Sequence, residues 1–395
     1  GLAGGAIKLS TYVDDVFSTY LYDGNSSTQT ITNGIDLSGE GGLVWNKCRS
    51  FDHNHFLTDT VRGVNSQLQS NNTDAASAGN NRVTGFSSDG FTLGDNANTN
   101  QSGQTFASWS FRKAPGFFDV VTYTGNGSVQ NISHSLGSVP GMIIVKNITT
   151  ATNWIVYHRS TGATKKLELN ETSAAATNSG PWNNTEPTSS VFTVGTNNSA
   201  NGANYVAYVF AHDDQSFGTD EDESIIKCGT YTIGGSGLFD ENLGFEPQFI
   251  LYKAISGGMG TPNWYIHDNM RGLAQTNFRP LFANTTTAES PATTEGLLTV
   301  YPTGFKSTSS THNAGDYIYM AIRRPNKPPT AAIEVFMPSA NQTDINLAAV
   351  PSNFPVDAVL TLATTQYNNH FMARLTGEKI LRTNQTATEI STSVD

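Results

Sequence analysis

The chain has few charged residues and little basic charge. Only 14% of its 395 residues are Asp, Glu, Lys or Arg, and 22 basic residues face 33 acidic ones, which gives a formal net charge of −11. Proteins that bind nucleic-acid phosphates do so through clusters of Lys and Arg, and this sequence has no such cluster. We therefore expect no nucleic-acid partner.

Long hydrophobic runs are also missing. The apolar segments are short, as in Met142–Val145 and Phe249–Tyr252, whereas a helix that crosses a bilayer needs about 20 apolar residues. We expect no membrane insertion. The N-terminus shows neither an initiator Met nor a basic leader with a long apolar segment, so we expect a processed chain or a fragment.

Cysteine is scarce. The two cysteines, Cys48 and Cys228, are too few for a disulfide scaffold or a cysteine-based metal site. Free cysteines are among the most buried residues in proteins, so we expect two buried thiols. Nothing in the sequence indicates a cofactor.

Glycine and aromatic residues, in contrast, are plentiful. The chain has 37 Gly, 21 Phe and 14 Tyr. Short segments rich in Val, Ile, Tyr and Phe alternate with turns of Gly, Asn and Asp, which is typical of antiparallel β-sandwiches. The sequence therefore predicts an all-β fold.

The clearest feature is an internal repeat with a period of roughly 100 residues. The pattern Leu-x-x-Asn-x-Thr occurs four times, and its asparagines are Asn71, Asn170, Asn284 and Asn384. An apolar segment that ends in Lys precedes it in three copies, at Lys47, Lys146 and Lys253. An apolar and aromatic segment closes the first three copies, at residues 106–111, 205–210 and 317–322.

These features predict tandem antiparallel β-sandwich modules of about 100 residues in an extended array. The predicted modules are repeats 1, 2 and 3 and a partial repeat 4, at residues 1–113, 116–212, 224–324 and 331–395. Stiff, proline-rich or acidic linkers favour a rod. The fourth copy stops before its closing strands, so we expect the chain to continue beyond Asp395 or, as a second choice, a partner to supply them.

Two local roles follow from the repeat. We interpret the four recurring asparagines as turn residues whose side chains bond to nearby backbone, rather than as glycosylation sites. Each module is also predicted to begin with a hairpin, because glycine-rich turns such as Gly125–Gly127 follow its first strand.

Several segments together resemble a known family. They are residues 116–127, 133–146 and 154–158, with similar segments at 59–63 and 90–94. This set resembles a module common in virion structural proteins of marine tailed phages, cyanophages among them, which are usually tail fibre proteins or unnamed. The resemblance implies a place on a virus particle, in a tail fibre or as capsid decoration, and it carries over no catalytic residues.

Metal-binding patterns are weak. His53 and His55 are two residues apart, so on a strand both imidazoles would share one face, as zinc or nickel requires. A surface turn is the preferred interpretation. The acidic run between Asp213 and Glu223 is interpreted as a solvated connector, and a Ca²⁺-binding joint is the alternative.

Tryptophan supplies the candidate ligand site. Trp154 and Trp264 recur in register, so we expect them in the core. Trp182 and Asn183 stand in a polar loop and form the candidate glycan-binding pair, because an indole face can stack on a sugar ring.

The leading hypothesis is a non-enzymatic phage virion structural protein, a tail fibre or capsid decoration subunit that binds host surface glycans. Its expected partners are other virion proteins, further copies of itself and host surface polysaccharide, and its expected location is the virion, outside the cell. One alternative is an extracellular filament or adhesin subunit of Ig-like modules. A third hypothesis, a polysaccharide-degrading tailspike, lacks the short-period repeat of a β-helix.

Overall fold

The fold is known from a computed structural model, which describes residues 10–64, 66–78, 81–257, 262–273, 279–289, 298–307, 313–328, 358–361, 370–373, 379–383 and 390–391. Regular structure in these ranges is nearly all β-strand, with antiparallel sheets and four single-turn helices. The predicted all-β, antiparallel fold is confirmed. None of the helices described is long and apolar enough to cross a membrane.

Repeat 1 is a β-sandwich of a large and a small sheet. The large sheet has the order β1-β9-β3-β4-β5-β6 and the small one β2-β8-β7. The elements are α1 (Val13–Val16), β1 (Phe17–Asp23), β2 (Gln29–Thr32), β3 (Gly42–Cys48), β4 (Phe56–Asp59), β5 (Ser66–Leu68), β6 (Ser77–Ala78), β7 (Val83–Ser87), β8 (Gly90–Leu93), α2 (Ala97–Asn100) and β9 (Thr105–Arg112).

Repeat 2 has the same strand order. Its large sheet runs β10-β17-β12-β13-β14-β15, and its small sheet is the pair β11-β16. The elements are β10 (Phe118–Thr124), β11 (Gln130–Ser133), β12 (Met142–Asn147), β13 (Ile155–His158), β14 (Lys165–Glu168), β15 (Ala176–Thr177), β16 (Val191–Val194), η1 (Thr196–Asn198) and β17 (Asn204–Phe210).

Repeat 3 follows a short hairpin of β18 and β19. Its sheets are β20-β27-β22-β23-β24 and β21-β26-β25. The elements are β18 (Gln215–Phe217), β19 (Glu223–Ser224), β20 (Ile226–Ile233), β21 (Asp240–Asn242), β22 (Pro247–Ala254), β23 (Tyr265–Asp268), η2 (Asn269–Arg271), β24 (Leu281–Phe282), β25 (Leu298–Tyr301), β26 (Gly304–Ser307) and β27 (Gly315–Arg323).

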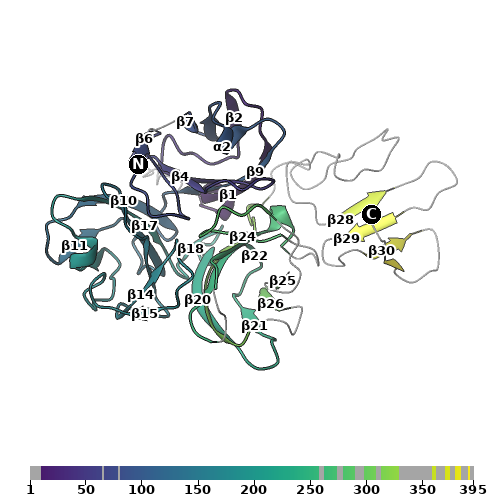
Figure 1. Ribbon diagram of the computed structural model, residues 1–395. Helices are drawn as coiled ribbons and strands as arrows, with labels where there is room; N and C mark the ends of the chain where they lie inside the picture. The colour runs from purple at the N-terminus through teal and green to yellow at the C-terminus, as the bar shows by residue number, and fades with distance from the viewer. Residues whose placement is uncertain are drawn as a thin grey trace, which may run out of the picture.

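Repeat 4 is a single described sheet, which Figure 1 shows to one side of the other three. Its order is β28-β29-β30-β31. These strands are β28 (Ala358–Thr361), β29 (His370–Ala373), β30 (Lys379–Arg382) and β31 (Ile390–Ser391).

The large sheets of repeats 1 and 3 are buried on both faces. In β27, Ile318 and Met320 belong to a core shared by the repeats, while Tyr317 and Tyr319 belong to the core under the small sheet. Successive side chains of a strand point to opposite faces, so both faces of β27 carry buried apolar or aromatic side chains. This double burial explains why the central strands read as short continuous apolar runs.

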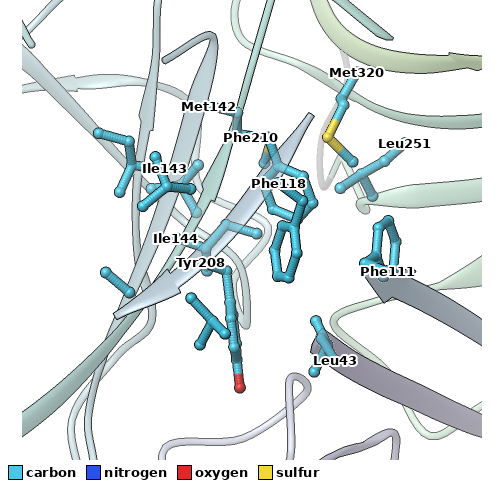
Figure 2. Close-up of a cluster of buried hydrophobic side chains, with 14 of the residues drawn as sticks. Leu43, Phe111, Phe118, Met142, Ile143, Ile144, Tyr208, Phe210, Leu251 and Met320 are labelled. Atoms are coloured by element: carbon cyan, nitrogen blue, oxygen red, sulfur yellow. The ribbon is translucent and has the colours of Figure 1, made fainter. Parts of the chain in front are cut away.

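The three large sheets face one another around a common centre (Figure 1). Phe111 of repeat 1 lies 5.6 Å from Phe210 of repeat 2 and 6.1 Å from Phe249 of repeat 3, measured between ring centroids. Figure 2 shows Phe111, Phe118 and Met320 converging on this centre. The prediction of an extended array is therefore wrong for repeats 1–3, because each large sheet buries its second face against the other two.

The two ends of this three-repeat unit meet. After β27, the backbone N–H of Asn326 donates to the Asp14 carboxylate at 3.0 Å, and its side-chain oxygen accepts from the Val13 N–H at 3.2 Å. The start of the proline-rich segment after Arg324 is thus hydrogen-bonded to α1. These bonds close repeats 1–3 into a ring.

One sequence prediction about turns is wrong. β10 pairs with β17 and β11 pairs with β16, so the turn at Gly125–Gly127 joins two sheets and does not form a hairpin. The acidic run does connect repeats 2 and 3 with exposed acidic side chains at Asp220–Asp222, as expected of a solvated connector. It forms the β18–β19 hairpin, in which Phe217 is buried and the Gly218 N–H donates to the carbonyl of Thr11.

A substitution at the common centre tests the closed arrangement. We expect Phe111→Ala to lower the free energy of unfolding by about 3–5 kcal/mol, because it leaves a cavity where three repeats meet. Thermal and urea unfolding of the full chain measure the change, and Val129→Ala, at an exposed valine of repeat 2, is the control. If Phe111→Ala unfolded one repeat and left the other two equally stable, the shared core would be contradicted.

Candidate functional site

The recurring lysines reach from one repeat to the next. Lys146 Nζ donates to the carbonyl of Thr73 in repeat 1 at 3.1 Å. The equivalent bonds run from Lys47 to Thr286 in repeat 3, at 2.8 Å, and from Lys253 to Glu171 in repeat 2, at 3.2 Å. Each lysine therefore ends on the loop of a neighbour's Leu-x-x-Asn-x-Thr pattern, and the three contacts run in one direction around the ring.

The recurring asparagines shape the loops that the lysines reach. In repeat 2, Asn170 Oδ1 accepts from the backbone N–H of Trp154 at 2.8 Å, and its Nδ2 donates to Asn153 Oδ1 at 3.0 Å. Asn71 and Asn284 make the same pair of bonds, to residues 54–55 and 263–264. These asparagines thus join two turns of their own repeat, and the partner backbone lies 16 to 20 residues earlier in the chain.

The two recurring tryptophans contact the same two interfaces as Lys146 and Lys253. Trp154 Nε1 donates to the carbonyl of Gln69 in repeat 1, and Trp264 Nε1 to that of Glu168 in repeat 2, both at 2.9 Å. Both indoles are at most 1% exposed. As expected from their register, they lie in the core, and they also fix adjacent repeats in one orientation.

A second ring of polar contacts lies where β4, β13 and β23 end. Tyr208 of repeat 2 donates its hydroxyl to Asp59 Oδ2 of repeat 1 at 2.9 Å, and Trp109 of repeat 1 donates Nε1 to Asp268 Oδ2 of repeat 3 at 3.0 Å. The third contact joins His158 Nε2 of repeat 2 to the carbonyl of Tyr319 in repeat 3 at 3.1 Å. Asp59, His158 and Asp268 hold equivalent positions in their repeats.

Arginines neutralise the two buried carboxylates of this ring. Arg62 Nε lies 2.6 Å from Asp59 Oδ2, and Arg271 Nε lies 2.7 Å from Asp268 Oδ2. Burial alone would lower the pKa of Arg271, but Asp268 and Glu289 beside it raise that pKa above its ordinary value. A buried charge is tolerated when it is paired and hydrogen-bonded in this way.

His158 supports the same structural role. Its Nδ1 accepts from the backbone N–H of Ser160, so the ring proton is placed on Nε2, which donates to Tyr319. Burial lowers the pKa of His158 to about 4, so the ring is neutral near pH 7. The five side chains of this second set of contacts and the two arginines all bond to other groups of the protein, an arrangement that holds repeats together.

Trp182 lies inside the protein. Its indole is 1% exposed and packs edge-on against Tyr157, with ring centroids 5.8 Å apart. The buried ring offers no face to a sugar, which corrects the expectation of a stacking platform. Asn183 is exposed, with a positive φ of 51°. The two residues of the candidate glycan-binding pair therefore differ in exposure: Trp182 is buried and Asn183 is open to solvent.

The interpretation of His53 and His55 as a surface turn is wrong for His55. His55 is buried, and its Nδ1 accepts from Trp45 Nε1 at 2.9 Å. Both cysteines are free and buried, as predicted. Among the residues that the structure describes, no three His, Cys, Asp or Glu side chains lie close enough together to hold a metal ion. Asn384, the fourth recurring asparagine, lies outside the described residues.

Sequence reasoning found the recurring Lys, Asn and Trp but not what they contact. The in-register lysines were the signal, because a charged side chain repeated at the end of an apolar strand needs a buried partner. Asp59, Tyr208 and Trp109 carry no motif of their own. Trp109 and Tyr208 hold equivalent positions, opposite Trp45 and Ile144, and Asp59 is equivalent to Asp268.

The chain matches the family model of a domain of unknown function, DUF7483, over residues 13–325. It belongs to this family. The matched span begins at α1 and ends two residues after β27, so it contains every strand described in repeats 1–3. No curated protein matches the chain.

Removing the Tyr208 hydroxyl tests the polar contacts at the ends of β4, β13 and β23. We expect Tyr208→Phe to lower the free energy of unfolding by about 1–3 kcal/mol, because Asp59 then loses a buried donor. Urea unfolding of the full chain measures it, and Tyr20→Phe, at a half-buried tyrosine of β1, is the comparison. Equal stability of the two variants would contradict a structural role for the Tyr208–Asp59 bond.

The lysines predict a dependence of stability on pH. Burial lowers the pKa of Lys47 and Lys146 to about 8 and that of Lys253 to about 7, against 10.5 for a solvated lysine. Between pH 7 and 9 the unfolded chain binds more protons than the folded one, so the free energy of unfolding rises with pH. Below pH 7 the three lysines are protonated in both the folded and the unfolded chain, so the free energy of unfolding is reduced by the full cost of burying their charges.

Urea unfolding at pH 7, 8 and 9 measures this dependence. Lys253→Met removes the group with the lowest pKa of the three, so the rise should become smaller in this variant. Val129→Ala should keep the full rise. A slope that Lys253→Met leaves unchanged would show that Lys253 is not the source.

Proposed function

We propose that the chain is a non-enzymatic structural protein of a phage particle, a tail fibre or capsid decoration subunit built of tandem β-sandwich repeats. The observation that carries the proposal is that the recurring and buried polar residues of repeats 1–3 are used to hold the repeats together. Lys146, Asn170 and Trp154 all bond within the protein. The sequence resemblance to virion structural modules supplies the particle context.

One hollow that the structure describes is smaller than a usual ligand pocket. It lies next to the end of β27, has a volume of about 210 Å³ and is lined by Glu246, Pro302 and Arg323–Asn326, among others. Ligand pockets usually have roughly 300–1,000 Å³ and a largely apolar lining. Arg324 at this hollow pairs with Glu246 at 3.5 Å, and Arg323 pairs with Glu223 at 2.9 Å.

Host surface polysaccharide is part of the proposal as a ligand of exposed loops. Residues 183–186, which include Asn183, form one such exposed polar loop of repeat 2. Binding by loops on a rigid β-scaffold is a common arrangement in proteins. Trp182 is not part of this site.

Particle fractionation tests the function. We expect antibodies against the chain to detect it in density-purified phage particles, and immunogold to label the tail or the capsid surface. Detection on filaments of uninfected cells, with none in particles, would overturn the proposal in favour of an adhesin. Release of reducing ends from host capsular glycan by the pure chain would overturn its non-enzymatic part.

A further inference from the structure

Repeat 4 carries a row of apolar side chains across its sheet. Leu360 of β28 pairs with Phe371 of β29, which pairs with Leu381 of β30. Directly paired residues of antiparallel strands point to the same face. Leu360 is 56% exposed, Leu381 is 39% exposed, and Phe371 is partly exposed. This row, which we call the repeat 4 row, is therefore open to solvent within the described part of the chain.

The same row exists in repeats 1–3, where it is buried. The pairing register places three such rows on the equivalent strands, and all nine side chains are at most 2% exposed and belong to the shared core. The rows are Trp45–Leu57–Leu68, Ile144–Val156–Leu167 and Leu251–Ile266–Leu281. The face that is open in repeat 4 is thus the face that closes the ring in the other three.

The way in which repeats 1–3 close identifies the partner. Their faces pack as a set of three, and the contacts between them run head to tail around the centre. Head-to-tail contacts that close form a ring of equivalent units. The faces of repeats 1–3 already cover one another, so they do not cover repeat 4. The repeat 4 faces of two other copies would complete a set of three.

We propose that the repeat 4 row is an assembly surface through which three copies of this chain form a trimer. Each copy contributes one repeat 4 sheet, and the three sheets pack around a threefold axis as repeats 1–3 do within one chain. The inference deepens the proposed function, on which it rests for a partner that is another copy of the same structural protein.

The composition of repeat 4 fits an apolar contact. At the position of Asp59 and Asp268, the register of β28 and β29 places Ala373. A trimer built by this face therefore has no carboxylate at that position and depends mainly on burial of apolar surface. Its stability should change little with salt, unlike an association between charged surfaces.

The test uses the full chain in sedimentation equilibrium and mass photometry. We expect a particle of three times the chain mass of 42.3 kDa, at low and at high salt. Leu360→Lys with Leu381→Lys should reduce the mass to that of one chain, because charges then replace the apolar row. Leu360→Ala with Leu381→Ala, a milder change, should raise the dissociation constant at least tenfold.

Two controls keep the result specific. Val129→Lys with Val139→Lys, at valines of repeat 2 that are 47% and 52% exposed, should leave the trimer intact. Each variant is also checked by thermal unfolding, which should keep the main transition of repeats 1–3. A variant that loses this transition is replaced by the alanine pair.

The outcomes separate this inference from the proposed function. A monomeric or dimeric wild-type chain at micromolar concentration overturns the trimer, including the case in which further repeats of a longer chain cover the row. A monomer that is found in phage particles leaves the proposed function standing. A trimer that is absent from particles overturns the function and supports the assembly surface.

Discussion

The fold depends on the burial of both faces of three large β-sheets. A sheet that is apolar on both faces needs two covers. In repeats 1 and 3 one cover is the repeat's own small sheet, and in all three repeats the other is the pair of neighbouring large sheets. The three-repeat ring is the arrangement in which each sheet covers the others, so one repeat alone would expose the face that holds Phe111, Phe210 or Phe249.

Polar contacts then decide how the repeats are oriented. An apolar face by itself packs in many orientations, because the hydrophobic effect has no direction. The bonds from Lys146 to Thr73 and from Tyr208 to Asp59 join specific atoms of two repeats. Because an unpaired buried charge is costly, a rotated packing that broke these pairs would be strongly disfavoured. The lysines, tryptophans and carboxylates therefore select one arrangement from those that bury similar area.

The packing of repeats 1–3 is also the basis of our proposal for repeat 4. Repeats 1–3 and the family model end at nearly the same residue, which marks the ring as one structural unit. Repeat 4 has the same paired strands and the same apolar row, but its row is exposed. In our proposal the contact that is intramolecular in the ring becomes intermolecular at repeat 4. The chain would then use one packing solution for both folding and assembly.

The sequence by itself determined the all-β class, the repeat, the buried cysteines and the burial of Trp154 and Trp264. These follow from local patterns, because strand periodicity and recurrence are visible along the chain. The tertiary structure alone decided that the repeats form a ring, that Lys47 meets Thr286, and that Trp182 is buried. Such contacts join residues far apart in the chain, and their choice depends on how whole sheets cover one another, which no local pattern records.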